Sequence, residues 1–129
     1  GPAIGLGTLG EDQIPVVTVG RTPLAAFVGF EVAVRPIIAA LAGRESLFRP
    51  VVRANLTDQI ESRGGRREFL PAIVRLDSTS QRALVTVLHE PADEAALWLF
   101  RANALVIVPE AATALPAHEE VAVIRLDRE

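Results

Sequence analysis

A short apolar run late in the chain, Leu105-Val106-Ile107-Val108, constrains the fold more than any other segment. It is dense in β-branched residues and is stopped by Pro109, so it predicts a short strand that is covered on both faces. Before it we expect a short helix that begins at Pro91, where a missing N–H is tolerated, and ends near Asn103, which can adopt a left-handed closing conformation. This stretch is therefore expected to form the middle of a hydrophobic core.

Composition limits the classes of function. The chain has 129 residues, half of them hydrophobic, which suffices for one core, or for one core and part of another. Its formal charge is −3, and the one basic cluster is Arg63, Arg66 and Arg67, so we expect no nucleic-acid partner. Cysteine is absent, which excludes disulfides and thiolate metal sites.

The ends of the sequence and its apolar segments give two further expectations. Methionine is absent, so we expect a processed product or a piece of a longer protein, with Gly1-Pro2 as a cleavage scar. The longest apolar segment, residues 24–34, is interrupted by Glu31 and is shorter than the roughly 20 residues that cross a bilayer. We therefore expect a soluble protein without membrane insertion.

Residues 1–43 are predicted to be the end of an α/β domain. Residues 3–10 are glycine-rich without a period and predict an extended or looping approach, whereas residues 14–19 predict a buried strand. Thr22 and Pro23 are expected as N-cap and first position of a helix that reaches about residue 42, with a kink at Pro36. A strand, a turn and a helix make half of a βαβ unit, and its parallel partner strands are missing, so this domain is expected to be incomplete.

The expected helix over residues 23–42 is apolar all round, which predicts burial on more than one side. Because the sheet that should cover it is missing, we expect this helix to mediate self-association or a swapped arrangement. Its large apolar side chains form one stripe, namely Phe27, Phe30, Val34, Ile37, Ile38 and Leu41.

Residues 44–129 predict a small, mainly antiparallel β-barrel or sandwich, because apolar residues alternate with polar ones in several short segments separated by turns. The expected inward-facing residues are Val52, Ala54 and Leu56; Leu70, Ala72, Val74 and Leu76; Val85 and Val87; residues 105–108; and Ala122, Ile124 and Leu126.

Few side chains suggest a catalytic or metal site. His89 and His118 are the only histidines, and neither has a partner three or four residues away, so we expect no metal site and place each at a strand end or in a turn. Ser78 or Ser80 could be combined with His89 and Asp93, but no strained nucleophile turn is present. We therefore do not expect nucleophilic catalysis.

Two clusters leave alternatives open. Asp93 and Glu94 could act as acid and base, but at a helix start carboxylates ordinarily stabilise the helix dipole, which we favour. In Gly64-Gly65-Arg66-Arg67, two glycines permit a tight turn from which an arginine could bind an oxyanion. Solvent-facing arginines that lead into a strand are the alternative.

Several motifs in a fixed order carry a resemblance to a known family. The chain resembles the C-terminal part of the MoeA proteins and the related E domain of gephyrin, as an actinobacterial-looking member with degenerate site motifs. The motifs are Gly5-Leu6-Gly7-Thr8-Leu9-Gly10-Glu11-Asp12, Ile14-Pro15-Val16, Pro23, Phe30-Glu31-Val32, Val34-Arg35-Pro36, Gly65-Arg66-Arg67-Glu68-Phe69-Leu70, Arg101-Ala102-Asn103-Ala104-Leu105, Pro109-Glu110 and Glu119-Glu120-Val121.

The resemblance implies an α+β fragment with two domains. Residues 1–43 would supply the terminal strand and helix of a molybdopterin-binding α/β domain, and residues 44–129 the MoeA C-terminal β-barrel, domain IV. The intact family enzyme inserts molybdenum from molybdate into adenylylated molybdopterin with Mg²⁺, as a cytoplasmic homodimer whose site lies between domains of two subunits. Arg66, Glu68 and Pro23 would bind molybdate or molybdopterin, and the fragment alone would hold no cofactor and be inactive.

Departures from the family pattern put that activity in doubt. Arg21 and Thr22 stand where the family has Gly-Asn before the proline, and Asp93 and Glu94 stand near the family's paired serines. A lysine of the family has no counterpart at Pro2. A carboxylate about 4 Å from one anionic charge costs about 4 kcal/mol at an effective dielectric near 20. The alternative function is therefore a catalytically degenerate, gephyrin-like scaffold that binds a protein partner through the groove between its α/β and barrel domains.

Overall fold

The computed structural model describes residues 4–89 and 101–127 of the chain. The chain divides into two compact units, residues 1–48 and residues 49–129. The division falls at the end of the stretch 44–48, where the sequence pattern changes.

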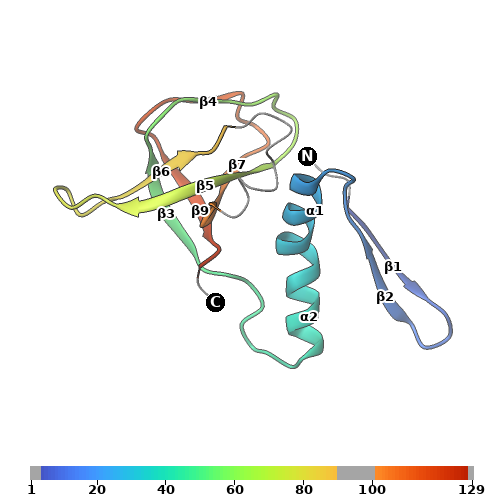
Figure 1. Cartoon of the computed structure of the whole chain (residues 1–129). Coiled ribbons are helices and arrows are strands. Elements are labelled where there is room, and N and C mark those ends of the chain that lie inside the picture. The colour runs from blue at the N-terminus through green and yellow to red at the C-terminus, as the bar shows by residue number, and fades with distance from the viewer. Residues whose placement is uncertain (1–3, 90–100, 128–129) are drawn as a thin grey trace. The chain divides into compact units, whose positions relative to one another are not determined.

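The second unit contains a closed barrel of five strands in the order β3-β6-β5-β7-β9, with β9 paired back to β3 (Figure 1). All neighbouring strands run antiparallel except β3 and β6, which are parallel. The predicted small, mainly antiparallel barrel is thus confirmed. Its strands are β3 (Val51–Leu56), β5 (Glu68–Leu76), β6 (Ala83–Val87), β7 (Ala104–Val108) and β9 (Glu120–Arg125).

Two further strands, which the sequence did not predict, pair beside the barrel. They are β4 (Ile60–Glu61) and β8 (Ala114–Leu115), and they lie between the segments that were expected to be strands. Ile60 and Leu115 are nonetheless buried and belong to the main core cluster. Each strand has only two residues, too few to show an alternating pattern.

The core fills the barrel interior with small and β-branched side chains. In β3, β5 and β6 the predicted alternation is confirmed, with Ala54, Leu56, Val74 and Val85 buried, although Leu76 at the end of β5 is 65% exposed. Residues Ala104, Leu105 and Val106 of β7 are all 0% exposed, so this strand is covered on both faces as predicted.

The prediction of which residues of β9 face the core is wrong by one position. Val121 and Val123 are buried, whereas Ala122 and Ile124, which were expected inside, are only half-buried. Val123 pairs with Val52 on one side and with Val106 on the other. Both faces of this strand carry apolar residues, so hydrophobic alternation alone does not fix which face is inside.

Asn103 lies directly before β7 and makes contacts that the sequence did not predict. It has no positive φ, so the expected left-handed helix closure is wrong, and the expected helix from Pro91 lies outside the described residues. Instead, the Asn103 Oδ1 accepts from the Val74 N–H at 2.7 Å and its Nδ2 donates to the Val74 carbonyl at 3.0 Å. The amide of the Asn103 side chain thus makes the two hydrogen bonds that the backbone of a neighbouring strand would make. It provides partners for the N–H and the carbonyl of Val74 in β5.

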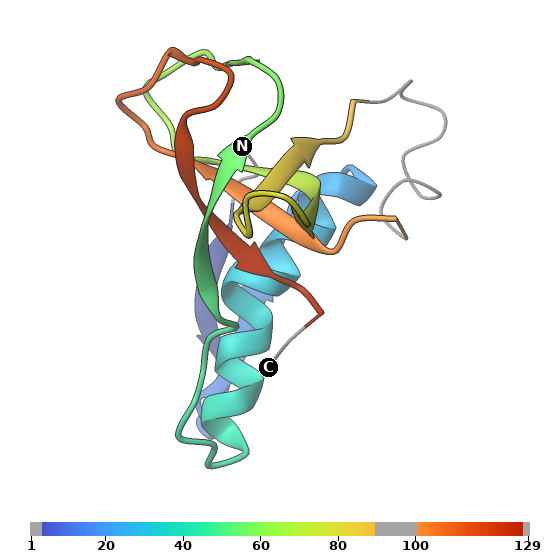
Figure 2. The same ribbon diagram turned by 90° about the vertical axis from the view of Figure 1, so that its left-hand side faces the viewer.

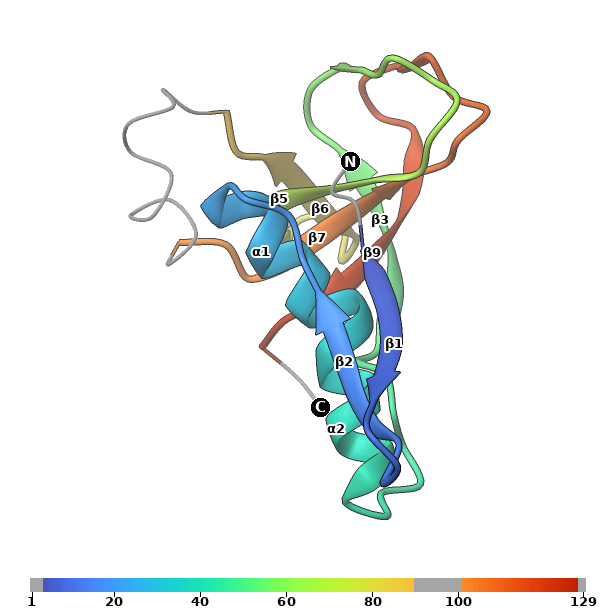
Figure 3. The ribbon, with the colours of Figure 1, turned by 90° about the vertical axis from the view of Figure 1, so that its right-hand side faces the viewer.

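The first unit begins with an antiparallel hairpin of β1 (Gly5–Leu9) and β2 (Ile14–Thr18), which lie side by side in Figure 3. Gly10 and Gln13 both have positive φ in the connecting turn. Residues 5–9 are therefore extended, which was one of the two forms expected for residues 3–10. The strand expected after them is present, but the expectation that it is buried is wrong. Ile14 is 57% exposed, and no residue of either strand is fully buried. A two-stranded hairpin of this kind has little stability on its own.

A helical segment follows as three consecutive parts, α1 (Pro23–Gly29), the π-helical η1 (Phe30–Val34) and α2 (Arg35–Leu41) (Figure 2). Thr22 is the N-cap and Pro23 holds the first position, as predicted. Pro36 lacks an N–H and its ring would clash with the carbonyl four residues earlier in a regular α-helix. The π-turn directly before α2, where the Arg35 N–H donates to the Phe30 carbonyl, takes up the irregularity expected at this proline.

Burial along this helical segment differs from the prediction. The buried residues are Val28, Gly29, Pro36 and Ala39, whereas Ile38 and Leu41 of the predicted large stripe are 54% and 71% exposed. A Cβ at Gly29 would lie 2.6 Å from Val19 Cγ1, so the small residue there permits close packing.

Length and composition alone would allow residues 23–41 to cross a membrane, since the segment has 19 residues and a mean hydropathy of 1.9. The helical segment is thus longer than the apolar run of residues 24–34, on which the expectation of no membrane insertion was based. The core helix of a soluble protein passes the same test of length and composition.

The register of β9 gives a direct test. We expect Val123→Ala to lower the free energy of unfolding by about 2 kcal/mol, because it removes buried methyl groups and leaves a cavity. Ile124→Ala is the matched control and should cost less than about 1 kcal/mol, although its side chain is larger. Urea denaturation of both variants measures this, and a larger loss for Ile124→Ala would contradict the register.

The Asn103 contact gives a second test. We expect Asn103→Ala to lower the free energy of unfolding by about 2–3 kcal/mol, because it leaves an N–H and a carbonyl of Val74 without their partner. Asn55→Ala is the control, since Asn55 makes one exposed hydrogen bond to the His118 carbonyl, at 3.1 Å. An equal decrease in the free energy of unfolding in both variants would show that the Asn103 hydrogen bonds stabilise the protein no more than the exposed hydrogen bond of Asn55 does.

Candidate functional site

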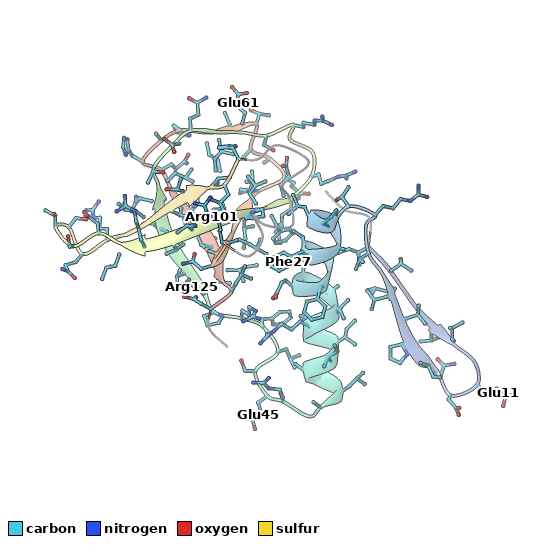
Figure 4. The ribbon with its side chains drawn as sticks, in the orientation of Figure 1. Glu11, Phe27, Glu45, Glu61, Arg101 and Arg125 are labelled. Carbon is cyan, nitrogen blue, oxygen red and sulfur yellow. The ribbon has the colours of Figure 1, made fainter. Side chains whose placement is uncertain are left out.

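The arginine loop, residues 62–67, connects β4 to β5 at one end of the barrel. It lies beside the connection between β7 and β8, residues 109–113, and Figure 2 shows these two loops together above the strands. In Figure 4, Glu61 marks this end of the barrel and Arg125 marks the opposite end. The loop carries Arg63, Arg66 and Arg67, all of which are exposed.

The backbone of the arginine loop is fixed by hydrogen bonds to the neighbouring connection. Gly64 and Gly65 have φ values of +71° and +73°, which glycine adopts without strain. The Gly65 N–H donates to the Glu110 carbonyl at 2.7 Å, and the Ser62 N–H donates to the Thr113 carbonyl at 2.9 Å. A Cβ at Gly64 would lie 3.1 Å from Thr113 Cγ2, so the Thr113 side chain packs closely against the backbone of the arginine loop.

Glu68, the first residue of β5, points its carboxylate back into this loop. The Ser62 hydroxyl donates to Glu68 Oε1 at 2.6 Å, and the Ser62 Oγ also accepts from the Gly64 N–H at 3.3 Å. Both interactions are partly buried. The arginines therefore stand on a turn that is held at its base, and their exposed guanidinium groups can form the paired hydrogen bonds that suit an oxyanion.

The other predicted site residues of the first unit stand at the start of α1. Thr22 has extended backbone angles, φ −84° and ψ 156°, and its hydroxyl accepts from the Ala25 N–H at 3.1 Å. Arg21 and Pro23 beside it are exposed. The structure thus brings Arg21, Thr22 and Pro23 together in one unit, and Arg66 and Glu68 together in the other.

Asp93 and Glu94 lie outside the described residues, so their roles stay predictions. The chain on both sides of that segment is placed. The Leu88 N–H donates to the Pro71 carbonyl at 3.0 Å, and the Asn103 N–H donates to the Ala72 carbonyl at 3.1 Å. These anchors lie three and four residues along β5 from Glu68, or roughly 10–13 Å at about 3.3 Å per residue.

The remaining polar candidates have structural roles. The Ser80 hydroxyl donates to Asp77 Oδ2 at 2.6 Å and lowers the pKa of that carboxyl group, within the turn between β5 and β6. His118 lies with positive φ in the turn before β9, and His89 lies just after β6, as the sequence predicted. Within residues 4–89 and 101–127, no group of three or more His, Cys, Asp or Glu residues could hold a metal ion.

Sequence reasoning missed Ser62 and the backbone of Glu110 as parts of the arginine loop. The Gly-Gly pair did signal the turn, but Ser62 is six residues from the carboxylate that it contacts, and serine near glycine is common in any loop. The contact with Glu110 joins segments that are distant in the sequence and has no local signal.

Comparison with known proteins gives the family. The sequence model of the MoeA C-terminal region (domain IV) matches residues 53–126. Molybdopterin molybdenumtransferase 1 of Mycobacterium tuberculosis (strain ATCC 25618 / H37Rv) is 35% identical over 124 residues, which cover 94% of this chain and 29% of that protein. Molybdopterin molybdenumtransferase 2 of the same strain is 35% identical over 96 residues, covering 74% of this chain and 23% of that protein.

Solved structures agree on the fold. A molybdopterin biosynthesis MoeA protein from Pyrococcus horikoshii has a TM-score of 0.74 and 23% identity, covering 98% of this chain and 29% of that one. A molybdenum cofactor biosynthesis protein from Pyrococcus furiosus has a TM-score of 0.69 and 28% identity, covering 88% and 38%. The chain spans less than a third of the length of the two curated relatives. The barrel and the match over residues 53–126 together show that the chain belongs to the MoeA family of molybdenum cofactor biosynthesis proteins and carries its C-terminal domain IV.

Proposed function

We propose that this chain forms the C-terminal part of a molybdopterin molybdenumtransferase, which transfers molybdenum from molybdate into adenylylated molybdopterin and releases AMP. Its relatives in Mycobacterium tuberculosis are named molybdopterin molybdenumtransferases, which supports the transfer of molybdenum to molybdopterin. Because the chain spans only 29% of the first of them, we assign the reaction to a longer protein and expect residues 1–129 to be inactive alone.

The observation that carries the proposal is the arginine loop. Molybdate is a tetrahedral dianion, and a planar guanidinium group can donate two hydrogen bonds to two of its oxygens. Arg66 follows directly on the Gly64-Gly65 turn, whose N–H at Gly65 is bonded to the Glu110 carbonyl. In this proposal Arg66 binds molybdate, and Arg63 and Arg67 add positive potential around it.

The family supports three further parts of the proposal. The working protein is a soluble, cytoplasmic homodimer, and Mg²⁺ and molybdopterin-AMP take part in its reaction. Pro23, at the start of α1, lies near the molybdopterin or molybdate. Among the described residues, no group of three or more His, Cys, Asp or Glu could hold Mg²⁺.

A second candidate function is a scaffold that has lost insertion activity and binds another protein. Arg21 favours it, because a long charged side chain stands before α1 where a glycine would permit close approach of a ligand. Asp93 and Glu94 favour it too, since carboxylates repel an oxyanion. In this case the family fold would be retained because its surface binds the partner protein.

Replacement of Arg66 tests the first function. We expect Arg66→Ala to weaken molybdate binding by about 10- to 100-fold in the full-length protein, through loss of charge-assisted hydrogen bonds of about 1.5–3 kcal/mol. Arg67→Ala is the matched control from the same loop and should change the affinity by less than about threefold, because in this proposal Arg67 acts only through a positive potential that salt screens and donates no hydrogen bond to molybdate. Isothermal titration with molybdate measures both.

The same titration separates the two functions. Molybdate affinity that does not depend on Arg66 would refute the proposed site. Asp93→Ser/Glu94→Ser should raise molybdate affinity, and no change in that double variant would remove the electrostatic argument for the scaffold. Reconstitution of an apo molybdoenzyme with adenylylated molybdopterin then reports whether bound molybdate is inserted.

The exposed apolar residues of α2 test self-association. We propose that the chain self-associates through the helical segment of residues 23–42, because Ile38 and Leu41 remain more than half exposed. We expect a dimer by sedimentation equilibrium at about 50 μM, within the range of weak apolar association. Ile38→Glu/Leu41→Glu should give monomers, whereas Ala40→Glu, an exposed control in the same helix, should not. A monomeric wild-type chain would contradict this proposal.

A further inference from the structure

The Ser62–Glu68 pair is the feature of the arginine loop that oxyanion binding by Arg66 does not explain. Glu68 is anchored in β5, where its backbone is in register with Val108 of β7. Its Oε1 accepts from the Ser62 hydroxyl at 2.6 Å, and Ser62 Oγ in turn accepts from the Gly64 N–H at 3.3 Å. A rigid strand is thus linked through one carboxylate and one hydroxyl to the turn that precedes Arg66.

The Ser62–Glu68 hydrogen bond, at 2.6 Å, is the shorter and therefore the stronger of these two hydrogen bonds. A hydroxyl that donates to a carboxylate at 2.5–2.7 Å is charge-assisted and about twice as strong as a neutral hydrogen bond. Gly64 and Gly65 give the loop more conformational freedom than other residues would, so the loop loses more entropy when it becomes ordered. A strong contact at the base of the loop offsets that freedom.

A carboxylate is also a poor direct ligand for a dianion. At about 4 Å in a partly solvated site the two would repel each other. In this structure the Glu68 carboxylate is instead engaged with Ser62 inside the loop, and Glu68 is less exposed than the arginines.

We propose that Glu68 is a positioning residue, which acts through the Ser62 hydroxyl to fix the Gly64-Gly65 turn and orient Arg66, and that it is not itself an oxyanion ligand. The part of this inference that concerns molybdate rests on the proposed function of Arg66. The part that concerns the order of the loop does not depend on it.

The first measurement is amide hydrogen exchange in the 129-residue chain. The Gly65 N–H, which donates to the Glu110 carbonyl, reports on the order of the loop. We expect Ser62→Ala and Glu68→Ala each to speed its exchange by about tenfold. Glu68→Gln retains an oxygen that can accept from Ser62 and should stay within about threefold of wild type.

A matched control exists in the same barrel. The Ser80 hydroxyl donates to Asp77 Oδ2, also at 2.6 Å, in the turn between β5 and β6. Ser80→Ala removes a serine–carboxylate contact of the same length and should leave the exchange of Gly65 unchanged. Unchanged exchange of Gly65 in both Ser62→Ala and Glu68→Ala would overturn the inference, whatever the result with molybdate.

The second measurement is molybdate affinity in the full-length protein. We expect Ser62→Ala and Glu68→Ala to weaken binding by about tenfold each, and the double variant to be no weaker than either one, because both remove the same contact. Loss of affinity in Glu68→Ala but not in Ser62→Ala would make Glu68 a direct ligand and refute the inference. If wild-type binding does not depend on Arg66, the proposed function fails, and the exchange of Gly65 alone decides the positioning role.

Discussion

Closure of the barrel by β3 and β9 is the constraint on which the second unit depends. β5 is the longest strand and pairs with both β6 and β7, so three strands would form a sheet without further help. The ladder from Val51–Ile124 to Asn55–Glu120 then joins the last strand to the first. Closure removes the open edges at which sheets otherwise aggregate, and it surrounds the small side chains of the core.

The loops that carry the candidate site are attached to two neighbouring strands of this barrel, β5 and β7. β7 leads into residues 109–113, and these residues accept hydrogen bonds from the arginine loop. Glu68 begins β5 and Glu110 follows β7, so the turn that precedes Arg66 is contacted from two neighbouring strands of the barrel. The Gly64-Gly65 turn thus has two conformationally permissive residues and hydrogen bonds on either side of it, from Ser62 to Glu68 and from Gly65 to Glu110.

Sequence reasoning predicted most of the barrel because its strands are short, β-branched and bounded by turns. It placed β9 in the wrong register, because Val121, Ala122, Val123 and Ile124 are all apolar and either face could be inside. The role predicted for Asn103 was wrong. From the sequence alone, an asparagine whose side chain bonds to the backbone of a strand cannot be told from an asparagine that ends a helix. The Ser62–Glu68 pair was missed because only the folded turn brings the two side chains together.

The pairing of β3 with β9 also affects how the chain acquires its structure. Val51 and Ile124 lie near opposite ends of the second unit's sequence, and the parallel pairing of β3 with β6 also joins segments that are not neighbours in the chain. Contacts between distant segments form slowly, because the entropy of closing the intervening loop is lost before the contact is made. During synthesis, β3 must therefore remain without its β9 partner until almost the whole domain has left the ribosome.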